Sequence, residues 1–163
     1  MSTINDHLVD WLRDAHAMEQ QAETMLNTMA SRVDDYPDLK ARILSHVEET
    51  RAQADRLRSC IEKRGEGPSI IKDTGGKLMG MAQGLTGLIM EDEVVKGVLA
   101  SYTFEHMEIM SYRLLIKTAE LADDSVTAGL CEQSLNEEIA MQRWLEENAP
   151  KILLRYVDLD RAA

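Results

Sequence analysis

Acidic residues interrupt apolar rows of this chain at positions that point inward. Glu19 stands four residues after Ala15 and three before Ala22, both members of a row of apolar residues at helical spacing. Residues three, four or seven apart share one face of a helix, so the Glu19 carboxylate is expected to face the interior. An ionised carboxylate in an apolar core is costly unless it is paired, protonated or bound to a metal ion.

The same arrangement recurs in three later segments. His46 and Glu49 are three residues apart, as are Glu105 and Glu108, and Glu138 stands alone between apolar neighbours. Each group falls near the middle of an expected helix, which places all of them at one height in an antiparallel bundle. A single glutamate beside an apolar row is usually a solvated flank, so the prediction depends on the coincidence across four helices. The candidate metal ligands are Glu19, His46, Glu49, Glu105, Glu108 and Glu138.

Two hypotheses account for such a set of residues. Five carboxylates and one imidazole offer enough donors for two first-row divalent ions, iron or manganese, in a protein that consumes peroxide or oxidises Fe²⁺. Alternatively, the acids share protons with one another, with His46 and with Gln53 in a non-enzymatic structural or interaction protein that holds no metal. Tyr112, one turn from Glu108, is either a hydrogen-bond donor or electron carrier for the site, or a plain core tyrosine.

Four long helices are expected to position these residues. The apolar spacing predicts helices over residues 3–31, 37–64, 92–121 and 125–148. Thr3 or Asn5 is expected to cap the first helix, and Asp35 the second, which Pro37 opens. Pro150 is expected to end the fourth helix, with a separate short helix following over residues 151–160.

The segment between the second and third helices is unusually rich in glycine. Five glycines interrupt an apolar stretch over residues 70–90, which is predicted to be either a closely packed helical crossover or a mobile connector. Two helix pairs joined by one long connection have the connectivity of ferritin-like bundles. The chain is therefore predicted to be all-α, a single ferritin-like antiparallel four-helix bundle domain over residues 1–163.

Composition limits the classes of partner. Lys and Arg number 18 against 29 Asp and Glu, a formal net charge of −11 that argues against binding to nucleic acid or to an anionic membrane. No apolar run is long enough to span a membrane and no signal peptide is evident, so a soluble, cytoplasmic protein is expected. Cys60 and Cys131 form no zinc motif and are predicted to be small core residues.

Several sequence strings resemble one bacterial family. They are Ala17-Met18-Glu19-Gln20, His46-Val47-Glu48-Glu49-Thr50 with Gln53, Arg56 and Leu57, Phe104-Glu105-His106-Met107-Glu108-Ile109-Met110-Ser111-Tyr112, and Leu135-Asn136-Glu137-Glu138. Over nearly its whole length the chain resembles the YciF-like, ferritin-like stress-protein family, also called DUF892. The resemblance implies a rubrerythrin-like bundle, commonly a dimer, associated with stress responses.

The chain departs from the usual di-iron spacing. Ferritin-like di-iron proteins carry Glu-x-x-His on two helices. Here the second helix has the reverse order, His46 before Glu49, and Glu138 is followed three residues later by Met141. Neither the geometry of the predicted site nor a redox activity follows from this spacing.

Overall fold

The computed structural model describes residues 2–65 and 94–162, and within these ranges the chain forms four α-helices and no strand. The first, α1, runs from Ile4 to Ala30. Thr3 and Asp6 form a capping box at its start, in which each side chain accepts a hydrogen bond from the backbone N–H of the other residue. The crossover predicted over residues 70–90 lies outside the described residues.

Helix α2 runs from Pro37 to Glu62. Pro37 supplies the first helical position, where the missing N–H costs nothing. The expected cap at Asp35 is wrong, because Tyr36 is the capping residue and its side chain makes no capping hydrogen bond. Past the end of α2, Gly65 adopts a φ of +77°, a left-handed conformation that glycine reaches without a side-chain clash.

A tight turn connects α5, Val94–Leu121, to α6, Ser125–Ala162. Asp124 ends this turn by accepting a hydrogen bond from the Thr127 backbone N–H at 2.9 Å, as an N-cap residue does. The Arg64 guanidinium also bonds the Asp124 carboxylate, so the C-terminal end of α2 is tied to the start of α6.

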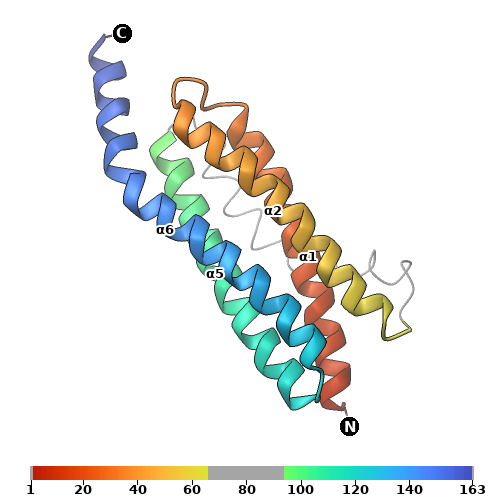
Figure 1. Cartoon of the computed structure of the whole chain (residues 1–163). Coiled ribbons are helices and arrows are strands. Elements are labelled where there is room, and N and C mark those ends of the chain that lie inside the picture. Colours follow the sequence, from red (N-terminus) through yellow and green to blue (C-terminus); the bar gives the residue numbers. More distant parts are fainter. Residues whose placement is uncertain (1, 66–93, 163) are drawn as a thin grey trace.

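The separate C-terminal helix predicted after Pro150 is wrong. Helix α6 contains Pro150 and continues to Ala162, with a change of direction toward its C-terminal end (Figure 1). Proline removes one helical hydrogen bond and displaces a carbonyl, which bends a helix when flanking contacts hold both halves. Ile152 is buried in the core, and Lys151 Nζ lies 2.5 Å from an Asp38 carboxylate oxygen, so these contacts hold the second half.

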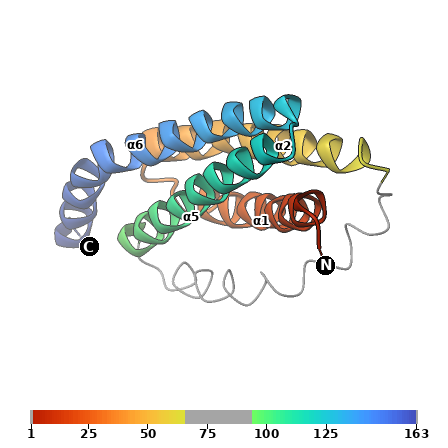
Figure 2. The same cartoon turned by 90° about the horizontal axis from the view of Figure 1, so that it is seen from below.

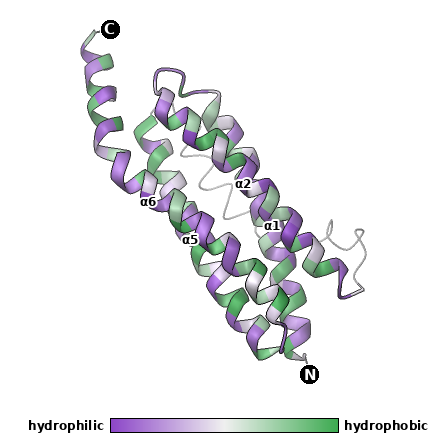
Figure 3. Cartoon of the chain, in the orientation of Figure 1, coloured by the Kyte–Doolittle hydropathy of each residue, from purple (hydrophilic) through white to green (hydrophobic). Residues whose placement is uncertain are grey.

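The four helices lie side by side as an antiparallel bundle in which α1 pairs with α2 and α5 pairs with α6 (Figures 1 and 2). Helices α2 and α5 run in the same direction, so the end of α2 and the start of α5 lie at opposite ends of the bundle. Each helix carries hydrophilic and hydrophobic residues side by side along its length, as amphipathic helices do (Figure 3). The all-α bundle is thus confirmed.

Two apolar clusters form the core. One contains the N-terminal part of α1, the C-terminal part of α2 and most of α5, and it includes Leu12, Leu57 and Phe104. The other contains Leu39 from α2 and Leu145 from α6. Along α2 and α6 the candidate site residues fall between members of the two clusters, in the middle of the bundle.

Two further sequence expectations concern cysteines and membranes. Cys60 and Cys131 are both buried and free, as predicted for small core residues. Among the described residues, no helix combines the length and the apolar content that crossing a bilayer requires.

Candidate metal centre

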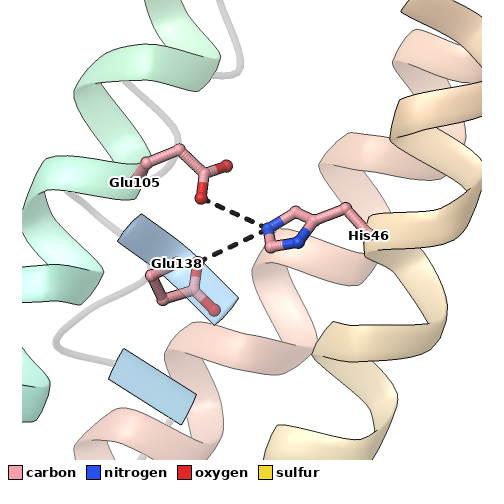
Figure 4. A group of neighbouring side chains, drawn as sticks. All are labelled: His46, Glu105 and Glu138. Carbon is pink, nitrogen blue, oxygen red and sulfur yellow. Dashed lines mark ion pairs between the residues drawn. The ribbon is translucent and has the colours of Figure 1, made fainter. Parts of the chain in front are cut away.

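Three buried side chains from three helices converge in the middle of the bundle (Figure 4). The Nε2 atom of His46, on α2, lies 3.2 Å from Glu105 Oε2 of α5 and 3.4 Å from Glu138 Oε2 of α6. One ligand atom from each residue lies within 4.8 Å of the others. Such a group of one imidazole and two carboxylates has the donors and the spacing of a site for one divalent cation.

Helical periodicity explains why these residues point inward. On α2 the buried positions Ile43, His46, Thr50, Gln53 and Leu57 recur at spacings of three and four. This spacing keeps them on one face of the helix. The polar members of the row therefore enter the core with the apolar ones and lie at the level of the site.

Glu19 of α1 and Glu108 of α5 belong to the same buried group. Both side chains are at most 1% exposed, and each interacts electrostatically with Glu138 and Glu105. The hydroxyl of Tyr112 donates a hydrogen bond to Glu19 Oε1 at 2.5 Å. All four helices thus contribute a carboxylate or an imidazole to one core cluster, which consists of Glu19, His46, Glu105, Glu108 and Glu138.

Glu49 lies at the margin of this core cluster. Its side chain is 30% exposed, whereas that of His46 is 1% exposed. Glu49 Oε2 lies 2.6 Å from His46 Nδ1, whereas the other ring nitrogen, Nε2, faces Glu105 and Glu138. One Arg42 nitrogen donates to both Glu49 oxygens, at 3.2 and 3.1 Å.

Several buried atoms of the core cluster make no well-aligned hydrogen bond within the described part of the chain, although His46 Nε2 lies close to Glu105 and Glu138. They are Glu19 Oε2, His46 Nε2, Glu105 Oε2, Glu108 Oε1 and both carboxylate oxygens of Glu138. Thr50 Oγ1 and Gln53 Oε1, on the same face of α2, are also without partners. Buried polar atoms without hydrogen bonds are costly, and their gathering in one place fits cations bound by the carboxylate oxygens and the ring nitrogen.

Burial controls the ionisation of most of the core carboxyl groups. It raises the pKa of Glu19 and of Glu108 well above the ordinary value, and repulsion from Glu138 adds to this effect. Burial also raises the pKa of Glu105 to about 8, although the nearby His46 opposes the rise. These three carboxyl groups are therefore protonated in much of the protein at neutral pH when nothing else compensates their charge.

His46 and Glu138 carry the charge of the metal-free cluster. Burial disfavours the imidazolium, but attraction to Glu105 and hydrogen bonds with Glu105, Glu138 and Glu49 raise the pKa of His46 well above its usual value. Burial tends to raise the pKa of Glu138. The hydrogen bond and the attraction to His46 outweigh burial, so the pKa of Glu138 is lowered. A protonated His46 beside an ionised Glu138 is the resulting state.

Sequence reasoning named Gln53 as a hydrogen-bonding neighbour of the core acids, but it missed the roles of Arg56 and Glu137 beside it. Arg56 of α2 donates to both carboxylate oxygens of Glu137, at 2.8 and 2.7 Å, and Gln53 donates to Glu137 at 3.0 Å. Arg42 was missed as well. The sequence placed Gln53 and Arg56 three residues apart on α2, but their partner on α6 depends on the alignment of two helices, which local spacing does not report.

Two other histidines lie outside the core cluster. His106 is exposed and contacts the ring of Tyr102 edge-on, with ring centroids 4.6 Å apart. His7 stacks on the exposed Trp11. Neither belongs to the core cluster.

An antiparallel helical bundle with this connectivity, and with glutamates from α1, α5 and α6 and a histidine from α2 at its centre, is a carboxylate-bearing bundle of the ferritin-like type. The chain matches the family described as "Domain of unknown function (DUF892)" over residues 3–158, and it belongs to this family.

Known relatives agree with this assignment. The chain is 30% identical to protein YciF of Escherichia coli (strain K12) over 152 residues, which cover 86% of each protein. Its fold matches the crystal structure of a protein from Xanthomonas campestris pv. campestris with a TM-score of 0.83 and 40% identity, covering 98% of this chain and 99% of that one. It also matches the crystal structure of the E. coli stress protein YciF, with a TM-score of 0.80 and 26% identity over 94% and 98% of the two chains.

Proposed function

We propose that the core cluster binds divalent metal ions, iron or manganese, as a dinuclear centre. The observation that carries this proposal is the convergence of one imidazole and four carboxylates, each at most 1% exposed. Each of these side chains has at least one buried oxygen or nitrogen atom that makes no hydrogen bond among the described residues. A pair of divalent cations would compensate the carboxylate charges that burial otherwise disfavours. Hard oxygen donors with a single imidazole suit Fe²⁺ and Mn²⁺ better than soft thiophilic ions.

The positions of the donors divide them into two groups. His46, Glu105 and Glu138 are close enough to hold one ion together. Glu19 and Glu108 would hold the second ion with a share of Glu138, with which both interact electrostatically. Glu49, predicted as a ligand from the sequence, is not included because the Arg42 and His46 side chains already engage it.

Bound iron would supply redox chemistry toward peroxide or dioxygen, and manganese would supply it toward peroxide. The contribution of the chain is to bind, to orient and to exclude water. Tyr112 fixes Glu19 through its hydrogen bond to Oε1, so the other oxygen of that carboxylate remains directed into the cluster. Each donor side chain is at most 1% exposed, and the two apolar clusters flank the donors along α2 and α6.

A role in stress physiology is proposed from relatedness. The E. coli relative is described as a stress protein, and a metal centre that handles peroxide or iron would fit such a role. The cytoplasmic location expected from the sequence is part of the same proposal.

The metal-free network is the second candidate. It is favoured by the ion pair of His46 with Glu105 and Glu138, at 3.2 and 3.4 Å, which partly neutralises the core without any cation. In that case the protein would be a non-enzymatic structural or interaction protein.

Heat denaturation separates the two candidates. A ligand that binds only the folded protein, present at a hundred times its dissociation constant, adds about 2.7 kcal/mol to stability. A rise in melting temperature with Mn²⁺ or Fe²⁺, reversed by chelator and absent with Mg²⁺ at equal ionic strength, is expected. An unchanged melting temperature with both ions would favour the network.

We also propose that the chain forms a homodimer. Four aliphatic side chains on one face of α5 are 52% to 63% exposed, and they are Leu99, Met110, Leu114 and Leu121. Exposed apolar patches commonly mark interaction surfaces. Sedimentation equilibrium should give twice the chain mass, and replacing Leu114 with Arg should shift it toward one chain mass.

A further inference from the structure

Two residues of α2, Glu49 and Arg42, form a chain of hydrogen bonds that ends at His46 Nδ1, the ring nitrogen on the side away from Glu105 and Glu138. Arg42, His46 and Glu49 are spaced four and three residues apart on α2. Arg42 donates to both oxygens of Glu49, and Glu49 Oε2 lies 2.6 Å from His46 Nδ1. The exposed fraction of the side chain is 30% for Glu49, 15% for Arg42 and 1% for His46. This chain of hydrogen bonds therefore connects partly exposed residues to the core cluster.

Glu49 differs from the core carboxylates in both contacts and solvent access. Glu19, Glu105, Glu108 and Glu138 each have at least one buried oxygen that makes no hydrogen bond within the described residues. Glu49 has none, because Arg42 and His46 engage its oxygens and solvent reaches the rest. The Glu49 carboxylate is therefore already hydrogen-bonded, and its contact with the core cluster is to the outer nitrogen of His46, Nδ1.

The contacts of the His46 ring determine which nitrogen is free to bind a cation. A neutral imidazole carries its proton on one nitrogen and a lone pair on the other. A carboxylate on Nδ1 keeps the proton there and leaves the lone pair on Nε2, the nitrogen that faces Glu105 and Glu138. The same contact fixes the rotation of the ring, so Nε2 cannot turn away from the two carboxylates.

We propose that Arg42 and Glu49 are positioning residues for His46, and that Glu49 is not a metal ligand. Glu49 orients the ring and sets its tautomer, and Arg42 holds Glu49 in the orientation that allows this contact. This inference rests on the proposed metal centre, since it names how the single nitrogen donor of that centre is held.

The test is metal titration of the whole chain and its variants with Mn²⁺ and with Co²⁺, whose visible spectrum reports its ligands. Glu49→Ala should weaken binding about 10- to 100-fold, as expected for loss of a hydrogen-bond partner of a ligand. The number of ions bound and the Co²⁺ spectrum at saturation should remain those of the natural chain, because no ligand is lost. Glu49→Gln should retain most of the affinity, since its amide oxygen can still accept a hydrogen bond from the Nδ1–H of His46.

Arginine variants on α2 provide the matched comparison. Arg42→Ala should weaken binding less than Glu49→Ala does, and Arg42→Lys should recover part of the loss. Arg51→Ala removes an arginine from the same helix whose partners, Glu23 and Glu48, lie away from the core cluster, and it should leave affinity unchanged. Circular dichroism in chelator establishes that each variant is folded.

The possible failures are distinguishable. Loss of a bound equivalent, or an altered Co²⁺ spectrum, in both Glu49→Ala and Glu49→Gln would make Glu49 a ligand and overturn the inference. Affinities equal to that of the natural chain for Glu49→Ala would overturn the positioning role while the metal centre stands. A natural chain that binds neither ion would overturn the proposed function and this inference together.

Discussion

The core carboxyl groups can meet the requirements of burial in two ways, by holding protons or by binding cations. Without cations, Glu19, Glu105 and Glu108 have raised pKa values because burial disfavours their ionised forms. With cations, the same groups must lose their protons before they bind. A neutral replacement of one residue should therefore have opposite effects on the metal-free and the metal-bound protein.

Glu108→Gln tests this at a single position. In chelator at pH 7 the variant should be more stable than the natural chain, by about 1 kcal/mol. Burial raises the pKa of Glu108, so this acid must take up a proton when the chain folds at pH 7, whereas the Gln amide is neutral in the folded and the unfolded chain. With Mn²⁺ its affinity should fall severalfold or more and the metal-dependent rise in melting temperature should vanish. Thermal denaturation with and without Mn²⁺ measures both effects.

Glu132→Gln, at an exposed position on the neighbouring helix α6, is the control and should change neither quantity. If Glu108→Gln behaved like this control, with changes of about 0.5 kcal/mol or less, the Glu108 side chain would reach water and both accounts of the core cluster would fail at this residue.

At the scale of the helices, the apolar spacing was sufficient to predict which residues of α1 and α2 face the core. On α2 the buried residues from Leu39 through His46 and Gln53 to Cys60 recur at spacings of three and four, as expected for one face of a helix. The helix break at Pro150 was wrong, because contacts of Lys151 and Ile152 elsewhere in the fold hold the rest of α6. Local preference does not include such contacts.

In the core cluster, too, some features were predictable from the sequence and others were not. The five inward residues were predictable because each belongs to an apolar row on its own helix. The contact between Arg56 and Glu137 was not predictable, because it depends on the alignment of α2 against α6. The outward position of Glu49 was not predictable either, since residues at the edge of a helical face turn inward or outward according to their neighbours.

The contact between α2 and α6 should have a measurable effect on stability. Arg56→Ala removes a side chain that bonds both oxygens of Glu137 and also Ser134, at 2.9 Å. The half-buried Glu137 carboxylate would then keep hydrogen bonds only from the side-chain amides of Gln53 and Gln133, without a positive charge beside it. The free energy of unfolding should therefore fall by about 1 to 3 kcal/mol. Chemical denaturation in chelator measures this change.

Arg58→Ala is the matched control on the same helix. Arg58 pairs with Asp55 at an exposed position, and such pairs contribute about 0 to 1 kcal/mol. Equal losses for Arg56→Ala and Arg58→Ala would show that the contact between α2 and α6 stabilises the bundle no more than a surface ion pair.

The whole molecule should have an unusual dependence of stability on pH. Burial raises the pKa of Glu105 from 4.5 to about 8 in the folded protein, and the pKa of His46 is also raised. A group with a raised folded pKa contributes stability that is complete below its unfolded pKa and is lost as the pH rises through the folded value. The metal-free protein should therefore lose the Glu105 contribution between about pH 5 and pH 8, and the His46 contribution only above the ordinary histidine pKa of 6.5.

For Glu105 alone this loss is on the order of 3 kcal/mol. Denaturation in chelator at pH 5, 7 and 8 measures it, and Glu105→Gln should flatten the profile. Metal affinity should rise over the same interval, because cations displace protons from the carboxyl groups. A metal-free protein as stable at pH 8 as at pH 5 would mean that the core carboxyl groups reach solvent.

The central claim is that the core cluster is a dinuclear metal centre, and metal content tests it most directly. The protein is purified without chelator and reconstituted anaerobically with Fe²⁺ or Mn²⁺. Unbound metal is removed by desalting, and the bound metal is measured by inductively coupled plasma mass spectrometry. We predict about two equivalents of iron or manganese per chain, reduced in Glu105→Gln and Glu108→Gln. Less than roughly a tenth of an equivalent of either metal after reconstitution would contradict the claim and leave the protonated carboxylate network as the account of the core.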